Sequence, residues 1–231
     1  MPAVLRITAT PLGNLEDISP RCARVLREAE IVFCEDTRRT LALLRHLGSP
    51  ARVLRYNEND DNSVSRCAAL AARHENTALV CDGGTPCVSD PGWKLAARFL
   101  AEGGKVESVP GPCAAAAAFS ASGFPSGAFV FLGFMPRKKS KMEKMLRAAA
   151  ALGRPLIIYE SPFRVKDTLE AVISALGART RVALAREMTK LHEEWLRGPA
   201  EDVLKELSSR DKILGEITLI ALPPRDEDAD I

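Results

Sequence analysis

The sequence predicts an α/β protein in which a mostly parallel sheet carries helices on its faces. Short apolar runs, typical of buried strands, alternate along the chain with stretches of helical periodicity. Loops rich in glycine and proline directly follow several of the apolar runs. Such alternation favours parallel strands joined by crossover helices. With 231 residues, 46% of them hydrophobic, the chain is long enough for one large domain or two small ones.

Strand and helix alternate through the first half of the chain. Ser19 and Pro20 predict the start of the first helix, because serine caps helix N-termini and proline suits the first helical position. Gly48 and the pair Gly103-Gly104 predict helix ends. The expected strands are 4–10, 31–34, 78–81 and 106–109, and the expected helices are 20–30, 41–47, 64–74, 93–101 and an alanine-rich helix that opens at Cys113.

The stretch 77–93 contains a loop that can be neither a helix nor a central strand. It places Gly83, Gly84 and Gly92 close to two prolines, so that left-handed backbone is accessible and two backbone donors are missing. In open α/β sheets, ligands bind at the carboxyl ends of strands, where glycine lets backbone N–H groups approach a ligand closely. A tight strand-to-helix connection without a ligand is the alternative interpretation.

Two further loops, 11–14 and 110–113, also follow expected strands. Because the carboxyl ends of parallel strands meet at one edge of a sheet, we expect these loops to open beside the loop 82–92. The convergence of three such loops predicts a pocket large enough for a nucleoside.

A second domain is expected after the stretch 123–127, which holds two glycines and a proline. We therefore predict an N-terminal α/β domain at 1–125 and a C-terminal α/β domain at 126–231. The end of the chain, 225–231, is acidic and is expected to be loose. The expected strands of the second domain are 129–134, 156–159, 182–185 and 213–222, with helices that run to Leu152 and to Leu176.

Composition argues against several classes of protein. The formal net charge of +2 gives no protein-wide attraction for nucleic acid, so any such attraction must come from a local patch. The six cysteines form no CxxC pair and the three histidines lie far apart in sequence, which predicts reduced core cysteines, no metal site and a cytoplasmic location. The first residues predict a strand and not a leader. Prolines and glycines interrupt the uncharged stretch 108–136, so we expect a buried loop, helix and strand there and no membrane association.

Familiar fingerprints of nucleotide and hydrolase sites are absent from the sequence. It contains no GxGxxG, no GxxxxGK[ST] and no GxSxG. What remains is a crevice lined by glycine and proline loops, which suits a cofactor held mainly by backbone groups.

A set of segments, in order along nearly the whole chain, resembles the tetrapyrrole-methylase superfamily of S-adenosylmethionine-dependent methyltransferases. The segments are TPLGNLEDISPR, CEDTRRT, DGGTPCVSDPG, VPGPCAA, FLGFMPRKKSK, YESPFR, AREMTKLHEE and GEITLIAL. The resemblance implies two α/β domains with an S-adenosylmethionine cleft between them, and a homodimer. Within the superfamily, the chain is most similar to members that methylate the ribose 2′-hydroxyl of a cytidine in the RNA of the small ribosomal subunit.

The resemblance also implies which residues contact the cofactor. Cys113 stands where serine is common in such sequences, Phe163 where histidine is common, and 57–59 where a more histidine-rich stretch is usual. The cofactor-binding residues implied are Pro11, Leu12, Gly13, Asn14, Gly83, Gly84, Thr85, Val88, Cys113, Ala114, Tyr159, Glu160 and Glu216.

Asp36 and Glu160 are the candidate catalytic residues. A ribose hydroxyl is a poor nucleophile, and a carboxylate would help to remove its proton while most of the rate comes from positioning. The structural alternatives are a helix cap with an ion pair for Asp36 and a hydrogen bond at the domain interface for Glu160. Asp82 is expected to brace its own glycine loop.

Basic residues predict where RNA phosphates bind. They cluster in the run 137–141, although a basic run at a helix start is often merely solvated. With 5% aromatic residues, the chain offers no evident platform for base stacking, so we expect it to recognise a shaped site on an assembled particle. The predicted substrate-binding residues are Glu35, Asp36, Arg38, Arg137, Lys138, Lys139, Lys141, Arg164 and Lys190.

Two other functions remain open on the sequence alone. The same cleft could methylate a small tetrapyrrole, although a small acceptor needs no phosphate-binding arm such as the basic run 137–141. Alternatively, the chain could sense S-adenosylmethionine and dock on RNA without catalysis.

Overall fold

The computed structural model describes residues 3–125 and 127–224. The chain divides into two compact units, Met1–Cys113 and Ala114–Ile231. This division precedes the alanine-rich helix α5 (Ala114–Ala121), whereas the sequence-based boundary follows it. The helix belongs with the second unit because it packs on that unit's sheet. The predicted loose tail at 225–231 lies outside the described residues.

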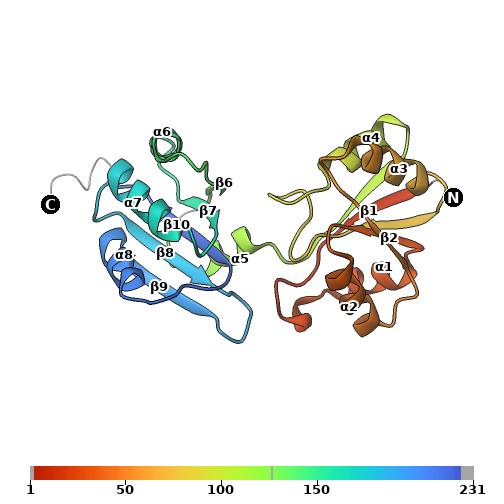
Figure 1. Ribbon diagram of the computed structural model, residues 1–231, viewed down its shortest axis with the longest axis horizontal. Helices are drawn as coiled ribbons and strands as arrows, with labels where there is room; N and C mark the ends of the chain where they lie inside the picture. The colour runs from red at the N-terminus through yellow and green to blue at the C-terminus, as the bar shows by residue number, and fades with distance from the viewer. Residues whose placement is uncertain (1–2, 126, 225–231) are drawn as a thin grey trace. The chain divides into compact units, whose positions relative to one another are not determined.

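Unit 1, which contains the N-terminal strand β1 (Figure 1), is built on five parallel strands in the order β3-β2-β4-β1-β5. The predicted parallel sheet is therefore confirmed. The sequence did not predict β3, which lies at one edge of this sheet. The strands are β1 (Val4–Thr8), β2 (Ile31–Cys34), β3 (Arg52–Arg55), β4 (Asn76–Leu79) and β5 (Lys105–Val109).

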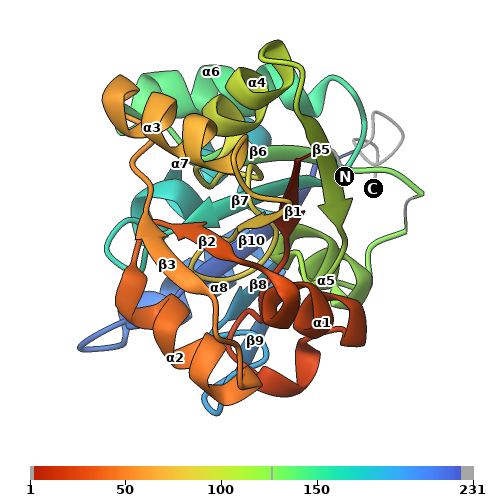
Figure 2. The same ribbon diagram turned by 90° about the vertical axis from the view of Figure 1, so that its right-hand side faces the viewer.

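Helices cover both faces of this sheet (Figure 2). Side chains alternate along each strand, so Ile31 and Phe33 of β2 pack towards α3 and α4, while Val32 and Cys34 pack towards α1 and α2. The helices are α1 (Pro20–Glu28), α2 (Thr37–Leu47), α3 (Asp61–Ala71) and α4 (Trp93–Ala101), and a short 3-10 helix spans Leu15–Asp17.

Local signals in the sequence explain where these helices begin and end. The Ser19 hydroxyl accepts a hydrogen bond from the Cys22 N–H at the start of α1, as the Ser-Pro pair predicts. Gly48, with φ of +66°, ends α2 in the left-handed conformation that favours glycine. Four of the six cysteines are buried, which confirms the core prediction for these four, whereas Cys87 and Cys113 are half-buried.

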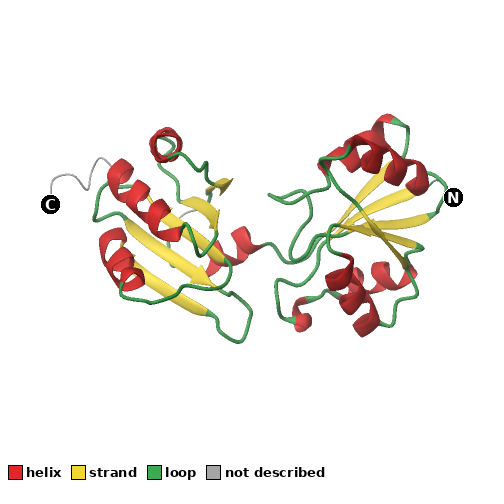
Figure 3. Ribbon diagram, in the orientation of Figure 1, coloured by secondary structure: helices red, strands yellow, loops and turns green. Residues whose placement is uncertain are grey.

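Unit 2 is built on a mixed sheet in the order β6-β7-β10-β8-β9. Strands β6 and β7 are parallel, and the other neighbours are antiparallel (Figure 3). Strand β9 and helix α8 were not predicted. The elements are β6 (Val130–Phe134), α6 (Lys139–Ala150), β7 (Leu156–Glu160), α7 (Val165–Leu176), β8 (Arg181–Arg186), β9 (Glu194–Pro199), α8 (Ala200–Ser208) and β10 (Ile217–Leu222).

Both faces of the second sheet are buried. Ile158, Leu184 and Leu219 belong to one core with α6, α7 and α8. Ile157 and Ile220 point to the other face and are also buried, where α5 packs over β7 and β10. The alanines of α5 permit that close approach.

In the described part of the chain, no helix has both the length and the apolar character needed to cross a membrane. The uncharged stretch 108–136 instead contains the end of β5, helix α5 and strand β6, so the expected succession of elements is confirmed. The expected burial is wrong, because most of the described residues of this stretch are partly or fully exposed.

Candidate functional site

The loops after β1, β4 and β5 meet in unit 1, as their predicted convergence requires. Thr10 and Gly84 exchange two backbone hydrogen bonds of 2.9 Å each. The Thr85 hydroxyl donates to the carbonyl of Pro112 over 2.8 Å. The middle loop is therefore bonded to both of its neighbours.

Two glycines allow these loops to approach so closely. A Cβ on Gly83 would lie 3.2 Å from the carbonyl oxygen of Pro11. Gly84 has φ of +91°, and a Cβ there would lie 3.2 Å from Cδ2 of Leu12. The absence of side chains at Gly83 and Gly84 thus lets the loops join through the backbone of Thr10 and Gly84.

The rest of the middle loop is held from a distant part of the chain. Glu58 accepts a 2.6 Å hydrogen bond from the N–H of Gly92, where α4 begins. Cys87 and Ser89 are in the left-handed region at φ of +69° and +60°, which is uncommon for residues other than glycine. Sequence reasoning missed the role of Glu58 because its partner lies 34 residues away.

Asp36 caps helix α2 and holds an arginine. Its Oδ1 accepts from the N–H of Arg38 over 2.8 Å, and its Oδ2 lies 2.8 Å from Nη2 of the same residue. These hydrogen bonds hold the pKa of the Asp36 carboxyl well below its usual range. The Asp36 side chain is 25% exposed, whereas that of Arg38 is 90% exposed. The arrangement matches the cap with an ion pair that the sequence left as an alternative.

Carboxylates at three neighbouring strand ends interact near Asp36. Partial desolvation and then the charges of Asp82 and Glu58 raise the pKa of Glu35. Asp82, expected to brace its own loop, instead forms an ion pair with Arg39 at 3.8 Å.

Glu160 is buried at the end of β7. Its oxygens accept from the Ser161 N–H and from the Thr168 hydroxyl, each over 2.8 Å, and the side chain is 1% exposed. Arg164 lies 3.6 Å from Glu160 and donates to the carbonyls of Met135 and Pro136. Glu160 and Arg164 thus join the ends of β6 and β7 to α7, within unit 2.

Tyr159 connects the same strand end to α5. Its hydroxyl accepts a 2.9 Å hydrogen bond from the N–H of Ala115. Its ring contacts Phe131 and Phe134, with centroids at 4.8 and 5.8 Å. The predicted cofactor residues Ala114 and Tyr159 are therefore brought together in unit 2.

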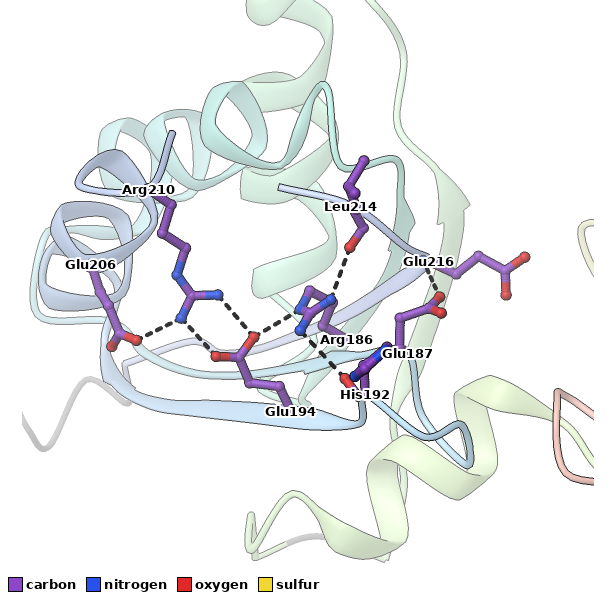
Figure 4. Close-up of polar contacts among 8 residues, drawn as sticks. All are labelled: Arg186, Glu187, His192, Glu194, Glu206, Arg210, Leu214 and Glu216. Carbon is purple, nitrogen blue, oxygen red and sulfur yellow. Dashed lines mark hydrogen bonds and ion pairs between the residues drawn. The ribbon is translucent and has the colours of Figure 1, made fainter. Parts of the chain in front are cut away.

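The loop between β8 and β9 is held by Glu187. This carboxylate accepts from the N–H of Glu216 over 2.8 Å (Figure 4) and from the ammonium of Lys190 over 2.9 Å. Lys190 also donates to Glu216 over 3.0 Å. The ammonium predicted to bind RNA is therefore shared by two carboxylates.

An ion-pair network fixes the base of this loop (Figure 4). Glu194 pairs with Arg186 at 2.8 Å and with Arg210 at 2.7 Å, and Arg210 also pairs with Glu206. Arg186 donates in addition to the carbonyls of Leu214 and His192. Hydrogen bonds from Arg210 and then Arg186 lower the pKa of Glu194 to about 2, against the opposing effect of burial.

The lowered pKa of Glu194 predicts a pH dependence of stability. Its contribution is complete above the ordinary pKa of 4.5 and is lost as the pH falls towards about 2. We expect Arg210→Met to lower the free energy of unfolding by roughly 2 kcal/mol at neutral pH and to flatten its pH dependence in this window. Urea denaturation between pH 2 and 7 measures both effects.

Arg179→Met is the matched control, because Arg179 pairs with Glu201 on an exposed surface and such pairs contribute about 0.5 kcal/mol. Equal losses in the two variants would show that the network adds nothing beyond a surface ion pair.

Every residue of the basic run 137–141 is exposed, at the start of α6. Lys139 pairs with Glu170 at 2.9 Å. Exposed Phe134 ends the strand before the run, and exposed Phe163 precedes Arg164, which is bonded to Met135 and Pro136. Composition gave no sign of a stacking platform, yet the structure exposes two aromatic rings near this basic surface.

The predicted site residues thus form separate groups. Each of the two units brings part of the cofactor set together. Unit 1 gathers Pro11, Leu12, Gly13, Asn14, Gly83, Gly84, Thr85 and Cys113 on or beside its three loops, with Val88 further along the middle loop; unit 2 holds Ala114, Tyr159, Glu160 and Glu216.

Comparison with known proteins identifies the family. The model of the Tetrapyrrole (Corrin/Porphyrin) Methylases matches residues 5–204. The chain is 42% identical over 218 residues to the Ribosomal RNA small subunit methyltransferase I of Hydrogenobaculum sp., covering 94% of each protein. It is 39% identical to the protein of that name from Thermotoga maritima, covering 94% of this chain and 96% of the relative.

Solved structures show the same fold at lower identity. Diphthine synthase aligns with a TM-score of 0.75 at 16% identity, over 95% of this chain and 90% of its own. Uroporphyrin-III C-methyltransferase from Thermus thermophilus, complexed with S-adenosyl homocysteine, aligns with a TM-score of 0.68 at 19% identity, over 94% and 96%. The resemblance drawn from the motifs is confirmed: the chain belongs to the tetrapyrrole methylase family, and within it to the ribosomal RNA small subunit methyltransferases I.

Proposed function

We propose that this protein is an S-adenosylmethionine-dependent methyltransferase that modifies the ribose 2′-hydroxyl of a cytidine in the RNA of the small ribosomal subunit. The observation that carries the proposal is the match to relatives of that name at about 40% identity, which extends over nearly the full length of both chains. The ribosomal acceptor implies a cytoplasmic enzyme, and we infer that it works as a homodimer.

The three joined loops of unit 1 fit the cofactor. A Cβ on Gly83 or Gly84 would lie 3.2 Å from Pro11 or Leu12 and would push the loops apart, so glycine at both positions keeps the loops together. A protein of the same fold was solved with S-adenosyl homocysteine. When bound, S-adenosylmethionine supplies an activated methyl group on a sulfonium. The residues proposed to hold it in unit 1 are 11–14, 83–85, Val88 and Cys113, and in unit 2 Ala114, Tyr159, Glu160 and Glu216.

RNA binding is proposed for the exposed cations. Arg137, Lys138 and Lys141 are exposed, and no ion pair involves them among the described residues. Phosphate contacts from such side chains give affinity without reading sequence. Arg38, the cation of the ion pair with Asp36, is 90% exposed. Because exposed ion pairs are weak, its guanidinium can exchange Asp36 for a phosphate at little cost in free energy. Glu35, Asp36, Lys139, Arg164 and Lys190 complete the proposed substrate-binding set.

We propose Asp36 as the proton acceptor, with Glu160 as a positioning residue. Glu160 is buried and its oxygens are bonded inside unit 2, whereas Asp36 is 25% exposed and its side-chain partner is the 90% exposed Arg38. When the Arg38 guanidinium turns to a phosphate, the Asp36 carboxylate keeps its backbone hydrogen bonds but loses the side-chain hydrogen bonds that lower its pKa most, and so becomes a stronger base.

Asp36→Asn is expected to lower kcat by about 100-fold or more, the contribution typical of a general base. Asparagine retains an oxygen that can cap α2, so the fold and the affinity for S-adenosyl homocysteine should remain unchanged. Single-turnover kinetics and calorimetry measure the two properties. If Asp36→Asn kept activity within threefold of the unaltered protein, Asp36 would act only as the helix cap of α2. A large loss of activity in Glu160→Gln alone would indicate that Glu160 is the proton acceptor.

Transfer of labelled methyl groups tests the function directly. Purified protein with methyl-labelled S-adenosylmethionine is offered small ribosomal subunits, naked small-subunit RNA or a tetrapyrrole. We expect label in ribose of the subunit RNA, and more of it in assembled subunits than in naked RNA. Label in the tetrapyrrole, or binding of the cofactor with no transfer to any ribosomal fraction, would contradict the proposal.

A further inference from the structure

Unit 1 contains a cavity beside the cofactor loops that the motifs did not assign. Its volume is about 300 Å³, at the lower end of the range for small-molecule sites. It lies between α2 and the strand ends, and the ion pair of Arg39 with Asp82 is part of its lining. The lining residues include Pro11, Gly13 and Leu43.

We propose that this cavity holds the base of the nucleotide to be methylated, and that Arg39 and Asp82 read its edge. The inference rests on the proposed function and names the residues that determine its specificity. An enzyme that modifies a nucleotide within structured RNA takes the target out of its stack and reads the Watson–Crick edge in a pocket.

The chemistry of the ion pair matches cytosine. Cytosine offers an amino donor at N4 beside acceptors at N3 and O2, and carboxylates accept from that amino group. Asp82 supplies the acceptor and Arg39 supplies donors for N3 and O2. Uracil presents an acceptor at the position of the amino group, so its O4 would face the Asp82 carboxylate.

Both side chains are available to a ligand. The distance of 3.8 Å between Nη1 of Arg39 and Oδ2 of Asp82 is an ion-pair contact and exceeds hydrogen-bond length. The side chains are 61% and 41% exposed. A base entering the cavity can therefore hydrogen bond to both without breaking a buried contact.

The position of the cavity suits the reaction. It shares Pro11 and Gly13 with the proposed cofactor loop, but Gly83, Gly84 and Thr85 do not line it. A base in the cavity thus lies next to the proposed cofactor site, but away from the junction of Gly83 and Gly84 with the loop 11–14. The exposed guanidinium of neighbouring Arg38 can bind a phosphate of the RNA strand that carries this base.

The adenine of the cofactor presents a similar edge, with an amino donor beside an acceptor, and the test must separate the two ligands. Asp82→Asn and Arg39→Met are compared with the unaltered protein and with Arg45→Met, which removes an exposed cation elsewhere on α2. Melting temperatures establish that all variants are folded. Each is assayed on reconstituted subunits that carry cytidine or uridine at the acceptor position.

We expect the unaltered protein and Arg45→Met to prefer cytidine by roughly tenfold or more. In Asp82→Asn and Arg39→Met, the preference should fall to within threefold, while calorimetric affinity for S-adenosyl homocysteine stays unchanged. An unchanged preference would overturn the inference. A tenfold weaker affinity for S-adenosyl homocysteine would also overturn it, because the cavity would then hold adenine. Absence of RNA methylation by the unaltered protein would count against the proposed function itself.

Discussion

Gly92→Ala is expected to lower the free energy of unfolding by about 3 kcal/mol, the largest loss of stability predicted for this chain. Gly92 has φ of +140°, and its Cβ would lie 2.5 Å from Cδ2 of Leu79 and 2.8 Å from Sγ of Cys87. Leu79 is buried in the core of unit 1, so it cannot move aside freely. The N–H of Gly92 also donates a hydrogen bond to Glu58, and the substitution would displace that hydrogen bond as well.

Gly103→Ala separates the steric clash from the backbone strain. Gly103 has φ of +82°, but nothing lies within 4 Å of the Cβ position. Its substitution should cost only the strain of a left-handed alanine, about 1 kcal/mol. Urea denaturation measures both variants. Equal losses would mean that the packing around Gly92 relaxes and that the loop is softer than its contacts indicate.

Gly84→Ala is expected to weaken the binding of S-adenosyl homocysteine by about tenfold or more, equivalent to at least about 1.4 kcal/mol. The residue has φ of +91°, and its Cβ would press on Leu12 from 3.2 Å. The Leu12 methyl can shift by a few tenths of an ångström, but the strained backbone of residue 84 also carries both of the hydrogen bonds to Thr10, which should weaken. Because the cofactor is proposed to rest on the backbone of these two loops, their separation should reduce affinity directly. Calorimetry measures the change.

Gly48→Ala is the control for this experiment. It has φ of +66° and open space around the Cβ position, and it ends α2 outside the proposed cofactor loops. It should lose some stability and keep its affinity for S-adenosyl homocysteine. If Gly84→Ala bound the ligand as tightly as Gly48→Ala does, the cofactor would not depend on the junction of the two loops.

Much of the fold could be predicted because local signals agree with the final structure. The apolar run at Ile31–Cys34 is buried on both faces, as in a central parallel strand. Ser19 and Gly48 mark helix ends by hydrogen bonding and by backbone conformation. Convergence of the three loops followed from the direction of the strands alone.

The missed elements lie at the edges of the two sheets. Strand β3 is RVLR, with exposed arginines at both ends, and β9 ends in Gly-Pro. Such sequences form strands only because a neighbouring strand supplies hydrogen bonds, and proline is tolerated at an edge. Helix α8 carried a usable signal, because Ala200, Val203 and Leu207 recur at helical spacing and are buried.

The loops of the candidate site could be predicted from the sequence, but the side-chain contacts that hold these loops could not. The DGGTP motif identifies Gly83 and Gly84, because glycine itself allows the close approach of the loops. Contacts between distant segments, such as Glu58 with Gly92 and Asp82 with Arg39, depend on tertiary structure. No spacing in the sequence reveals them.

Mapping of ribose methylation on small-subunit ribosomal RNA tests the central claim most directly. The map is compared between cells that have the gene, cells that lack it and cells in which this chain is restored. We predict that one cytidine loses its 2′-O-methyl group when the gene is removed and regains it with the unaltered chain, but not with Asp36→Asn. An identical map in all of these cells would contradict the account.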